Sequence, residues 1–439
     1  MMTHELRMFL RGAALLGIAV FGPGTAAQAQ TFTTIYSFTG GSDGEYPFPE
    51  SHLIFDANGN LYGTAASGGV NYNGTVFQLV PPTISGGKWT VNTLYEFQGG
   101  ADGRQPSMGV VFDANGNLFG TTQFGGNAQA CGGGCGTIFE LSPPGQGGGA
   151  WTHTVLYTFQ GNADGQYPGT MHLGANGALY STTTSGGANP GVLCHSNQRI
   201  KFGCGTFFEF AEQGGKWTKT VLYTFPHYKG DGTGPSSEFT FDSLGNVFTF
   251  TAGGATGYGS VVELMPPSGG GSWTDTVIHS FTGGSDGGYP AGTLTIGAGG
   301  VLYGAASYSG VANASGLIFQ FTPPAQSGGV WTETVLHNFP AYKGDATTPF
   351  TTLAMDPSGN LYGTSVFGGS TACYEGCGTI FKLAPPSIGG EWTESVLYKL
   401  GNSGQNPNSS LVDFHNGLLF GTTTYLGVGN VGSLFTLVP

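Results

Sequence analysis

The sequence predicts an all-β fold, a seven-bladed β-propeller of four-stranded blades. Three observations predict it. A phrase that begins with tryptophan recurs at intervals of 56 to 66 residues, and a period of about 60 residues is close to that of a large propeller blade. Shorter phrases within this period recur seven times, and the last unit lacks a fourth strand that a segment near the start of the chain could supply. The tryptophans are Trp89, Trp151, Trp217, Trp273, Trp331 and Trp392.

The composition is that of a turn-rich β protein. Glycine and proline contribute 82 and 24 of the 439 residues, and aromatic residues make up 13%, whereas disordered chains are poor in aromatics. Glycine does not recur at every third position, which excludes collagen. The chain has only 12 Lys and Arg against 25 Asp and Glu, a net charge of −13. So few cations cannot form a basic patch, which excludes nucleic acid as a partner.

Residues 1–29 have the pattern of a secretory signal peptide. Two arginines accompany an apolar stretch over 10–21, and Ala27-Gln28-Ala29 forms a small-x-small cleavage site. The apolar stretch is shorter than the roughly 20 residues that span a bilayer, so a membrane anchor is the less favoured interpretation. We expect a single propeller domain over residues 30–439 and no transmembrane segment. We also expect a monomer that is secreted, periplasmic or held at the cell surface.

Each unit contains four predicted strands, illustrated here by the first complete unit. A short apolar strand over 53–55 is followed by Asp-Ala-Asn-Gly at 56–59, and Asn-Gly is a strong signal for a tight hairpin. The second strand, at 61–64, reads Leu-aromatic-Gly-Thr, and the third includes Gly-Thr-Val-Phe at 74–77. The fourth strand runs from tryptophan to phenylalanine over 89–97. Val, Thr and aromatic residues punctuated by Gly and Pro favour strands throughout.

The two ends of the chain are predicted to meet in one blade. The last unit ends after its third strand, while residues 33–38 match the Tyr-x-Phe phrase of a fourth strand. Closure of the ring by this strand would leave no exposed sheet edge. We therefore expect residues 33–38 to complete the seventh blade, with Ile35 and Phe38 packed beside Leu434 and Phe435.

These phrases resemble the GloVer tandem-repeat proteins of bacteria, named for Gloeobacter-type and Verrucomicrobia-type proteins. The motifs that carry the resemblance lie at 36–44, 59–64 and 74–77, and their copies cover nearly all of residues 31–439. The resemblance implies export with varied anchoring devices, although we expect this chain to lack a C-terminal anchor. It implies no established catalytic activity.

Propeller topology places two kinds of loop on one face, which we name the loop face. These are the connections from a fourth strand to the next first strand, and those from a second to a third strand. The first kind carries a recurring aspartate. Its carboxylate could bind Ca²⁺ or sugar hydroxyls, because hard cations prefer oxygen ligands; alternatively, each aspartate caps its own turn. No other cofactor or metal is predicted. The aspartates are Asp43, Asp102, Asp164, Asp231, Asp286 and Asp345.

All six cysteines lie in the second kind of loop, shortly before a third strand. They form three local pairs, and locally paired cysteines in an exported protein indicate disulfides. Zinc ligation is the alternative, although only one pair has a neighbouring histidine, His195. The predicted disulfides are Cys131–Cys135, Cys194–Cys204 and Cys373–Cys377.

Two further sets of residues are candidates for ligand binding. Aromatic residues near the loop tips could stack on sugar rings or could pin their own loops; they are Phe124, Tyr308, Phe367 and Tyr425. First strands line the central channel of a propeller, where polar residues that depart from the repeat could form a specific site or could simply be hydrated. These channel candidates are His52, His172 and Glu238.

Together these patterns favour a non-catalytic, exported binding module that recognises a glycan, a peptide or another envelope protein through the loop face. One alternative is an enzyme that acts on carbohydrate, either a glycosidase or a lyase. Glycoside hydrolysis needs two carboxylates about 5–5.5 Å or 6.5–9.5 Å apart, and few carboxylates lie outside the repeat. The other alternative is a structural or adhesive surface array without a discrete pocket. No catalytic residue is predicted.

Overall fold

The computed structural model describes most of the chain from residue 30 to residue 439. The predicted signal peptide lies outside the described residues. Within 30–439, the residues that are not described are 48–52, 85, 107, 127–128, 130, 146–147, 188–202, 227–231, 270, 327, 342–344, 374–375, 388, 402–410, 416 and 425–430.

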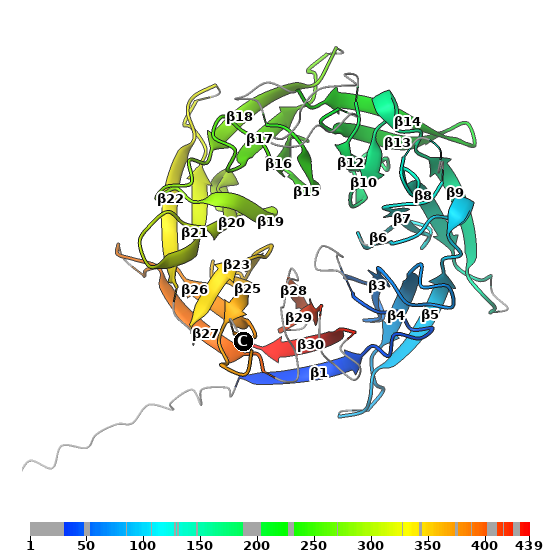
Figure 1. Ribbon diagram of the computed structural model, residues 1–439, viewed down its shortest axis with the longest axis horizontal. Helices are drawn as coiled ribbons and strands as arrows, with labels where there is room; N and C mark the ends of the chain where they lie inside the picture. Colours follow the sequence, from blue (N-terminus) through cyan, green and yellow to red (C-terminus); the bar gives the residue numbers. More distant parts are fainter. Residues whose placement is uncertain are drawn as a thin grey trace, which may run out of the picture.

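Seven antiparallel sheets form a ring around a central axis, which confirms the predicted β-propeller (Figure 1). In each sheet the first strand of the unit lies nearest the axis and the fourth forms the outer wall. Blade one contains β2 (Ile54–Phe55), β3 (Leu61–Ala65), β4 (Thr75–Val80) and β5 (Thr90–Glu96). Blade two contains β6 (Val110–Phe112), β7 (Leu118–Thr122), β8 (Thr137–Ser142) and β9 (Thr152–Thr158).

The next three blades repeat this order, and blade three has an inner strand in two pieces. Blade three contains β10 (Gln166–Pro168), β11 (His172–Leu173), β12 (Leu179–Ser185), β13 (Thr206–Gln213) and β14 (Lys216–Thr224). Blade four contains β15 (Pro235–Phe241), β16 (Val247–Thr251), β17 (Ser260–Met265) and β18 (Thr274–Ser280). Blade five contains β19 (Gly288–Ile296), β20 (Leu302–Tyr308), β21 (Ala314–Thr322) and β22 (Thr332–Pro340).

The last two blades complete the ring, and the inner strand of blade six is also divided. Blade six contains β23 (Ala346–Pro349), β24 (Ala354–Met355), β25 (Leu361–Gly368), β26 (Thr379–Ala384) and β27 (Thr393–Lys399). Blade seven contains β28 (Val412–His415), β29 (Leu418–Thr423), β30 (Ser433–Val438) and β1 (Thr31–Ser37). The short 3₁₀ helices are η1 (Gly100–Asp102), η2 (Asn162–Asp164) and η3 (Ala298–Gly300). None of the helices in the described parts of the chain has the length and apolar character to span a membrane.

The N-terminal strand closes the ring as predicted. β1 pairs with β30 from Thr31 opposite Val438 to Ser37 opposite Ser433, with a change of register between Thr34 and Tyr36. The C-terminal strand therefore lies between β1 and β29 and is paired along both of its edges, while β1 forms the outer edge of blade seven (Figure 1).

One detail of the predicted closure needs correction. Ile35, Phe38 and Leu434 share one buried cluster, as expected. Phe435 belongs to the neighbouring cluster, where its ring centroid lies 5.0 Å from that of Phe32. The reason is that successive side chains of a strand point to opposite faces of the sheet, so Leu434 and Phe435 cannot pack on the same side.

The Asn-Gly hairpins between first and second strands form for a local reason. In blade one, Asp56 Oδ1 accepts hydrogen bonds from the backbone N–H of Asn58 and of Asn60, each at 2.9 Å. Gly59 has a φ of 79°, a conformation that glycine adopts without a steric penalty. Hydrogen bonds from Asn60 and Tyr62 to the carboxylate outweigh the effect of burial and lower the pKa of Asp56.

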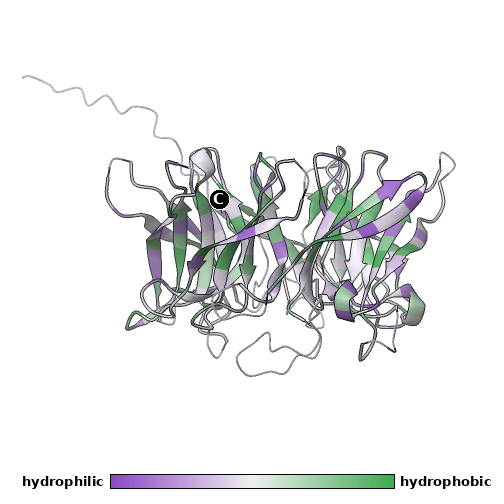
Figure 2. Cartoon of the chain, turned by 90° about the horizontal axis from the view of Figure 1, so that it is seen from above, coloured by the Kyte–Doolittle hydropathy of each residue, from purple (hydrophilic) through white to green (hydrophobic). Residues whose placement is uncertain are grey.

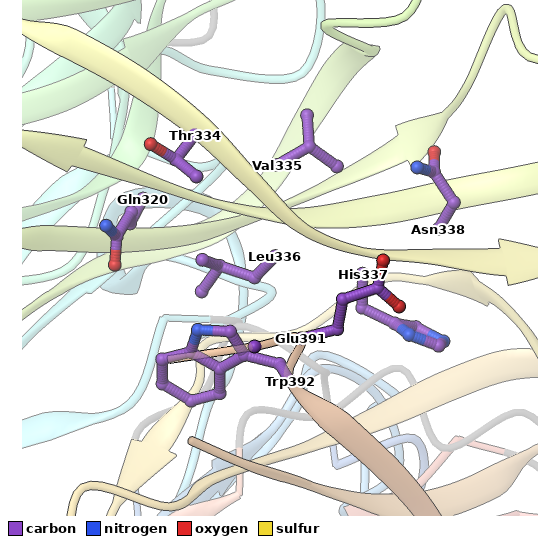
Figure 3. Close-up of a pocket in the computed structure, with 9 residues that line it drawn as sticks. Gln320, Thr334, Val335, Leu336, His337, Asn338, Glu391 and Trp392 are labelled. Carbon is purple, nitrogen blue, oxygen red and sulfur yellow. The ribbon is translucent and has the colours of Figure 1, made fainter. Parts of the chain in front are cut away.

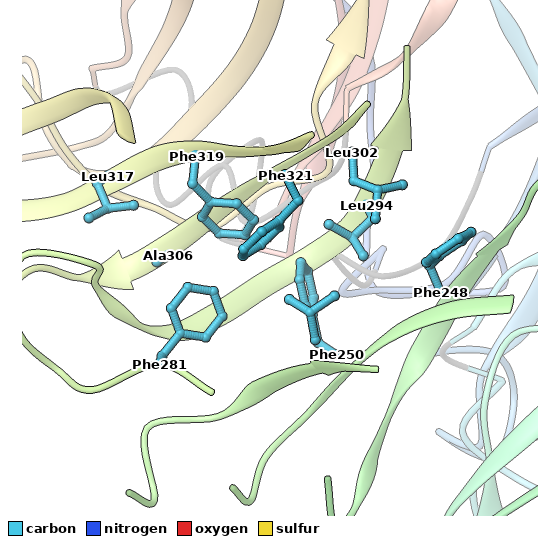
Figure 4. Packing of buried hydrophobic residues seen from close by; sticks show 10 residues of the cluster. Phe248, Phe250, Phe281, Leu294, Leu302, Ala306, Leu317, Phe319 and Phe321 are labelled. Atoms are coloured by element: carbon cyan, nitrogen blue, oxygen red, sulfur yellow. The ribbon is translucent and has the colours of Figure 1, made fainter. Parts of the chain in front are cut away.

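The hydrophobic core is divided among the interfaces between neighbouring blades. In the interface of blades four and five, Phe250 lies against Phe319, and Phe281 packs on the same ring, with Leu294 and Leu302 nearby (Figure 4). Viewed from the side, the strands cross the body of the disc and the loops emerge at its two faces (Figure 2). The core is thus a ring of inter-blade layers, which leaves the loops free to differ from blade to blade.

Candidate functional site

Hydrogen bonds join the two kinds of loop into the predicted loop face. The backbone N–H of Gly69, between β3 and β4, donates to the carbonyl oxygen of Gly41, in the loop that enters blade one, at 2.8 Å. The same contact recurs in blade two from Gly126 to Gly100, also at 2.8 Å. In blade six, Gly369 N–H donates to Asp345 O at 3.0 Å. These blades therefore present a composite surface built from both kinds of loop.

The described loop aspartates direct their carboxylates into their own loops. Asp102 accepts hydrogen bonds from Gln98 N–H at 2.7 Å and from the Tyr95 hydroxyl at 2.9 Å. Burial, followed by the bond to Asp102, raises the pKa of Tyr95. Asp43 makes the same contacts with Thr39 and Tyr36. This geometry agrees with the capping interpretation, and ligand binding by these carboxylates stays a prediction.

The remaining loop aspartates follow the same plan with different partners. Asp164 accepts from the Tyr157 hydroxyl at 2.7 Å and from Lys219 Nζ at 2.9 Å. Asp286 accepts from Thr282 N–H at 2.7 Å. Asp345 Oδ1 accepts from the backbone N–H of Ala346 at 3.0 Å. Asp231 lies outside the described residues.

Tyr308 belongs to a cluster of three tyrosines on the loop face, which we name the tyrosine cluster. Its ring centroid lies 5.9 Å from that of Tyr258 and 6.1 Å from that of Tyr289, and the Tyr258 and Tyr289 centroids are 5.4 Å apart. Tyr289 is 54% exposed and Tyr308 is 42% exposed. The rings thus contact one another while two of them remain open to solvent, an arrangement that suits contact with a ligand.

The backbone holds two members of the tyrosine cluster in place. The ring of Tyr258 lies so close to Gly283 that a Cβ atom there would be 2.4 Å from it. Tyr289 has a φ of 53°, although it precedes Pro290, and its N–H donates to Tyr258 O at 2.8 Å. A non-glycine residue rarely adopts such a φ, and conformations of this kind cluster at functional sites.

The strained residue before proline recurs around the ring. Equivalent positive φ values occur where a connecting loop enters an inner strand, at Tyr46, Gln105, Tyr167, Tyr289 and Thr348. The sequence reasoning missed these residues. The phrase Asp-Gly-x-Tyr-Pro, which appears in three units, was the signal that could have revealed them.

A second aromatic group lies between blades two and three. The ring centroids of Phe124 and Tyr167 are 5.3 Å apart, and the guanidinium carbon of Arg104 lies 4.9 Å from the centroid of Phe124. The cation and the ring face attract one another. Phe367, at the equivalent position of blade six, is half-buried, while Tyr425 lies outside the described residues.

Two of the predicted disulfides are present on the loop face. Cys131 is bonded to Cys135 and Cys373 to Cys377, each with a Cα–Cα distance of 5.2 Å. Both bridges precede a third strand, as the sequence predicts. Cys194 lies outside the described residues, so its pairing with Cys204 stays a prediction.

The channel candidates Glu238 and His172 lie near each other on neighbouring inner strands. Glu238, on β15, is 3% exposed, and its carboxylate accepts hydrogen bonds from the hydroxyls of Thr170 and Thr293. His172 Nε2, on β11, lies 3.8 Å from Glu238 Oε2. A buried carboxylate beside an imidazole can hold or transfer a proton. His52 lies outside the described residues.

A group of histidine and carboxylate side chains between blades four and five was not anticipated. His279 Nε2 lies 3.2 Å from Asp286 Oδ2 and 3.5 Å from Glu333 Oε2. Burial, followed by the charge of Asp286, raises the pKa of Glu333 to about 7, while burial lowers the pKa of His279. The available signal was the replacement of Tyr-x-Phe by His-x-Phe at 279–281.

A groove of about 470 Å³ lies on the outer wall, where β22 meets the segment leading into β27 (Figure 3). Gln320, His337, Asn338, Glu391 and Trp392 contribute to its lining. Burial lowers the pKa of His337, with the charge of Asp345 opposing. The groove is built from repeated strand positions, whereas the tyrosine cluster combines one loop residue, Tyr258, with Tyr289 and Tyr308 at the ends of β19 and β20.

The fold and the loop face define the class of protein as a closed seven-bladed β-propeller whose variable loops gather on one face. The chain belongs to the Gloeobacter/Verrucomicrobia repeat family, whose model matches residues 20–194 and 191–435. This membership confirms the family resemblance seen in the sequence. None of the curated proteins matches the chain in sequence.

Solved structures share the fold at low sequence identity. A polysaccharide lyase of family PL25, an ulvan lyase, is 11% identical with a TM-score of 0.54, and the alignment covers 89% of this chain and 92% of that one. The Hadza microbial sialidase Hz136 is 12% identical with a TM-score of 0.42, over 88% of this chain and 74% of the sialidase. At 11% identity the likeness to the ulvan lyase shows the fold alone.

Proposed function

We propose that this protein is an exported propeller that binds a carbohydrate chain on its loop face, with the tyrosine cluster as the central contact. The observation that carries the proposal is the cluster itself: three neighbouring phenol rings, two of them 54% and 42% exposed. Tyrosine combines a large apolar ring with a hydroxyl that makes hydrogen bonds. A sugar presents the matching surfaces, because its C–H faces are apolar and its rim carries hydroxyls.

The rigidity of the cluster supports recognition without a large entropic cost. Tyr258 rests on Gly283 and Tyr289 is fixed by its backbone bond to Tyr258. Side chains that are already ordered lose little conformational freedom on binding. Tyrosine, with only two rotatable side-chain bonds, is a common contact residue in binding surfaces for the same reason.

Charge narrows the ligand class to neutral glycans. The chain carries a net charge of −13 and only 12 basic residues, so a polysaccharide rich in sulfate or uronate groups would be repelled at long range. A propeller of similar fold, the ulvan lyase, has been solved with the saccharide -[GlcA(1-4)Rha3S]- bound. That likeness supports a propeller scaffold for carbohydrate, while the acidic composition here favours an uncharged chain.

Export and a single domain over residues 30–439 are part of the proposal. Cleavage of residues 1–29 would release the propeller to an oxidising compartment, where disulfides persist. The bridges Cys131–Cys135 and Cys373–Cys377 support this location. Sequencing of the N-terminus of the protein recovered from culture fractions tests it, with residue 30 as the expected first residue.

The binding proposal is tested by a glycan array followed by affinity measurements on variants. We expect the double variant Tyr289→Ala, Tyr308→Ala to bind the selected neutral glycan at least about tenfold more weakly, because stacking on rings of this kind contributes on the order of 1 kcal/mol each. The control is Tyr72→Ala, since Tyr72 is 71% exposed and lies outside the cluster. Equal affinities for all three proteins would refute the tyrosine cluster as the binding site.

Carbohydrate cleavage is a second candidate function, favoured by the buried Glu238–His172 pair. Such a pair could act as an acid or base toward a sugar chain that enters the channel. Incubation of the protein with glycans that it binds, followed by product analysis, tests this function. Release of oligosaccharides that is lost in Glu238→Gln would support it, and bound but intact glycan would favour the binding module.

A further inference from the structure

Three positions meet at several of the described boundaries between consecutive blades, and we name such a set a junction. The first is the residue that begins the Tyr-x-Phe phrase, the second is the loop aspartate that follows it, and the third lies two residues after the tryptophan of the next blade. In the described part of the chain, direct contacts join the three side chains of these junctions: Tyr95–Asp102–His153, Tyr157–Asp164–Lys219 and His279–Asp286–Glu333.

The junction of blades two and three shows that this position accommodates a cation. Lys219 Nζ lies 2.9 Å from Asp164 Oδ1, and the lysine side chain is only 1% exposed. The same nitrogen lies 5.0 Å from the ring centroid of Phe208 and 5.3 Å from that of Phe159. The buried ammonium group is thus held by one carboxylate and by aromatic faces, both of which attract a positive charge.

The junction of blades four and five places the opposite charge at that position. Glu333 stands where Lys219 stands, so two carboxylates, those of Asp286 and Glu333, face one imidazole, that of His279. One ligand atom from each of the three side chains lies within 4.8 Å of the other two. Within the described residues, Glu333 Oε1 is buried without a hydrogen-bond partner. Two partly buried carboxylates this close to each other repel one another unless a cation lies between them.

We propose that the junction of blades four and five binds a divalent transition-metal ion, such as Zn²⁺ or Mn²⁺, through His279, Asp286 and Glu333. The ion supplies the positive charge that Lys219 supplies in the equivalent place between blades two and three. A site of one imidazole nitrogen and two carboxylate oxygens suits these ions better than Ca²⁺, which takes oxygen ligands. This site is independent of the glycan-binding proposal.

The surroundings of the three side chains fit a metal site. Thr282 N–H donates to Asp286 Oδ2 at 2.7 Å and Gly284 N–H donates to Oδ1 at 3.2 Å, which orients the carboxylate. The ring of His279 packs against Phe281 at 4.9 Å and Phe321 at 5.3 Å between centroids. Outer hydrogen bonds and apolar walls of this kind orient ligands and limit the access of water.

The bound ion would join blades four and five. His279 lies on β18, Glu333 lies on β22, and Asp286 lies in the loop between the two blades. Coordination by all three would connect the outer strands of two blades that are already joined by hydrophobic packing and by a backbone hydrogen bond from Tyr289 to Tyr258. Because a ligand that binds only the folded state stabilises it by an amount that grows with the logarithm of the ligand concentration, the metal should raise the melting temperature of the protein.

The experiment measures bound metal after equilibrium dialysis of the whole protein against Zn²⁺, Mn²⁺ or Ca²⁺, and the melting temperature with and without a chelator. Two variants copy other junctions and are therefore compatible with the fold: His279→Tyr and Glu333→Lys. Glu333→Gln, which keeps the size of the side chain, is a third variant in case either of them fails to fold. Glu212→Gln removes an exposed carboxylate and controls for net charge.

We expect the wild-type protein and Glu212→Gln to bind one more equivalent of Zn²⁺ or Mn²⁺ than each junction variant, and only these two to lose thermal stability with the chelator. The readout is a difference between proteins, so metal bound elsewhere cancels. Equal amounts of bound metal in the wild type and in the folded junction variants would overturn the proposal. Binding of Ca²⁺ alone would also overturn it.

Discussion

The indole of Trp331, in blade five, packs edge-on against Phe248, in blade four, with ring centroids 5.9 Å apart. The same contact joins Trp151 to Tyr62 at 6.5 Å and Trp392 to Tyr303 at 6.2 Å. In these three phrases the tryptophan therefore covers the second-strand aromatic of the preceding blade, whereas Trp273 packs against Phe207 on a third strand. Because this contact forms at successive boundaries, both residue types recur with the period of the blade.

Closure of the ring by β1 predicts a strong effect of an N-terminal deletion. Removal of residues 30–39 would expose the edge of β30 and would leave the buried cluster around Leu434 without Ile35 and Phe38. Unpaired edges promote aggregation. We expect the deleted protein to aggregate or to lose more than about 4 kcal/mol of unfolding free energy, since the loss of a buried phenylalanine alone costs about 3–5 kcal/mol. Size-exclusion chromatography and thermal unfolding measure this; a soluble variant with an unchanged melting temperature would contradict closure.

The disulfides are predicted to be three local bridges. Peptide mapping of the non-reduced protein by mass spectrometry should recover Cys131–Cys135 and Cys373–Cys377, which the structure contains, and also Cys194–Cys204. Each short loop should contribute about 2 kcal/mol to stability by restricting the unfolded chain. Replacement of Cys131 and Cys135 by serine should therefore lower the melting temperature without changing the fold. A bridge between two different loops would show that the local pairing is wrong.

Much of the fold could be predicted from the sequence because its determinants are local or periodic. The Asn-Gly turns require only residues within one hairpin, such as Asp56 and Gly59. Closure could be inferred because one strand was missing from the last unit and an equivalent one preceded the first. The ring contact of Phe32 with Phe435 was missed, because Phe435 was placed with Leu434 although successive side chains of a strand point to opposite faces of the sheet.

The candidate site was less predictable because its residues come from different blades. Tyr258 precedes the third strand of blade four, whereas Tyr289 and Tyr308 lie at the ends of two strands of blade five. Their contact depends on which loops are adjacent in space. The junction residues are equally distant in sequence, and only an alignment of the Trp-Thr phrases would have placed Glu333 opposite His279.

A further prediction tests whether the ligand binds the loop face of the disc or the opposite face. Replacement of Phe124, Phe367 and Tyr425 by alanine should weaken glycan binding if the ligand extends across the loop face, because loop-tip aromatics contribute little to the core. Replacement of Asn58, which precedes Gly59 in a tight Asn-Gly turn on the opposite face, should change stability and leave affinity unaltered, because asparagine before glycine favours this turn. Affinity measured by calorimetry and melting temperature distinguish these outcomes. If affinity follows Asn58 and ignores the aromatics, the assignment of the loop face is wrong.

The junction of blades five and six, which consists of His337, Asp345 and Glu394, predicts a dependence of stability on pH. Burial, followed by the charge of Asp345, raises the pKa of Glu394 from 4.5 to about 7, while Lys399 opposes the shift. A carboxyl group with a raised pKa binds its proton more tightly in the folded protein than in the unfolded chain. The stability that Glu394 contributes is therefore fully present below about pH 4.5 and is lost as the pH rises to about 7.

The variant Glu394→Gln isolates this contribution, because glutamine resembles the protonated carboxyl group at every pH. His337 acts in the opposite direction, since burial lowers its pKa and the associated stability is lost as the pH falls below 6.5; its effect is common to both proteins and cancels in their difference. Urea unfolding between pH 4 and pH 8 should show the wild type losing on the order of 1 kcal/mol of unfolding free energy relative to Glu394→Gln, after allowance for solvent screening.

The control is Glu391→Gln, at an exposed position on the same segment, which should follow the wild type. A difference between wild type and Glu394→Gln that stays constant across this range would mean that Glu394 keeps an ordinary pKa, and that the junction tolerates its two carboxylates without taking up a proton.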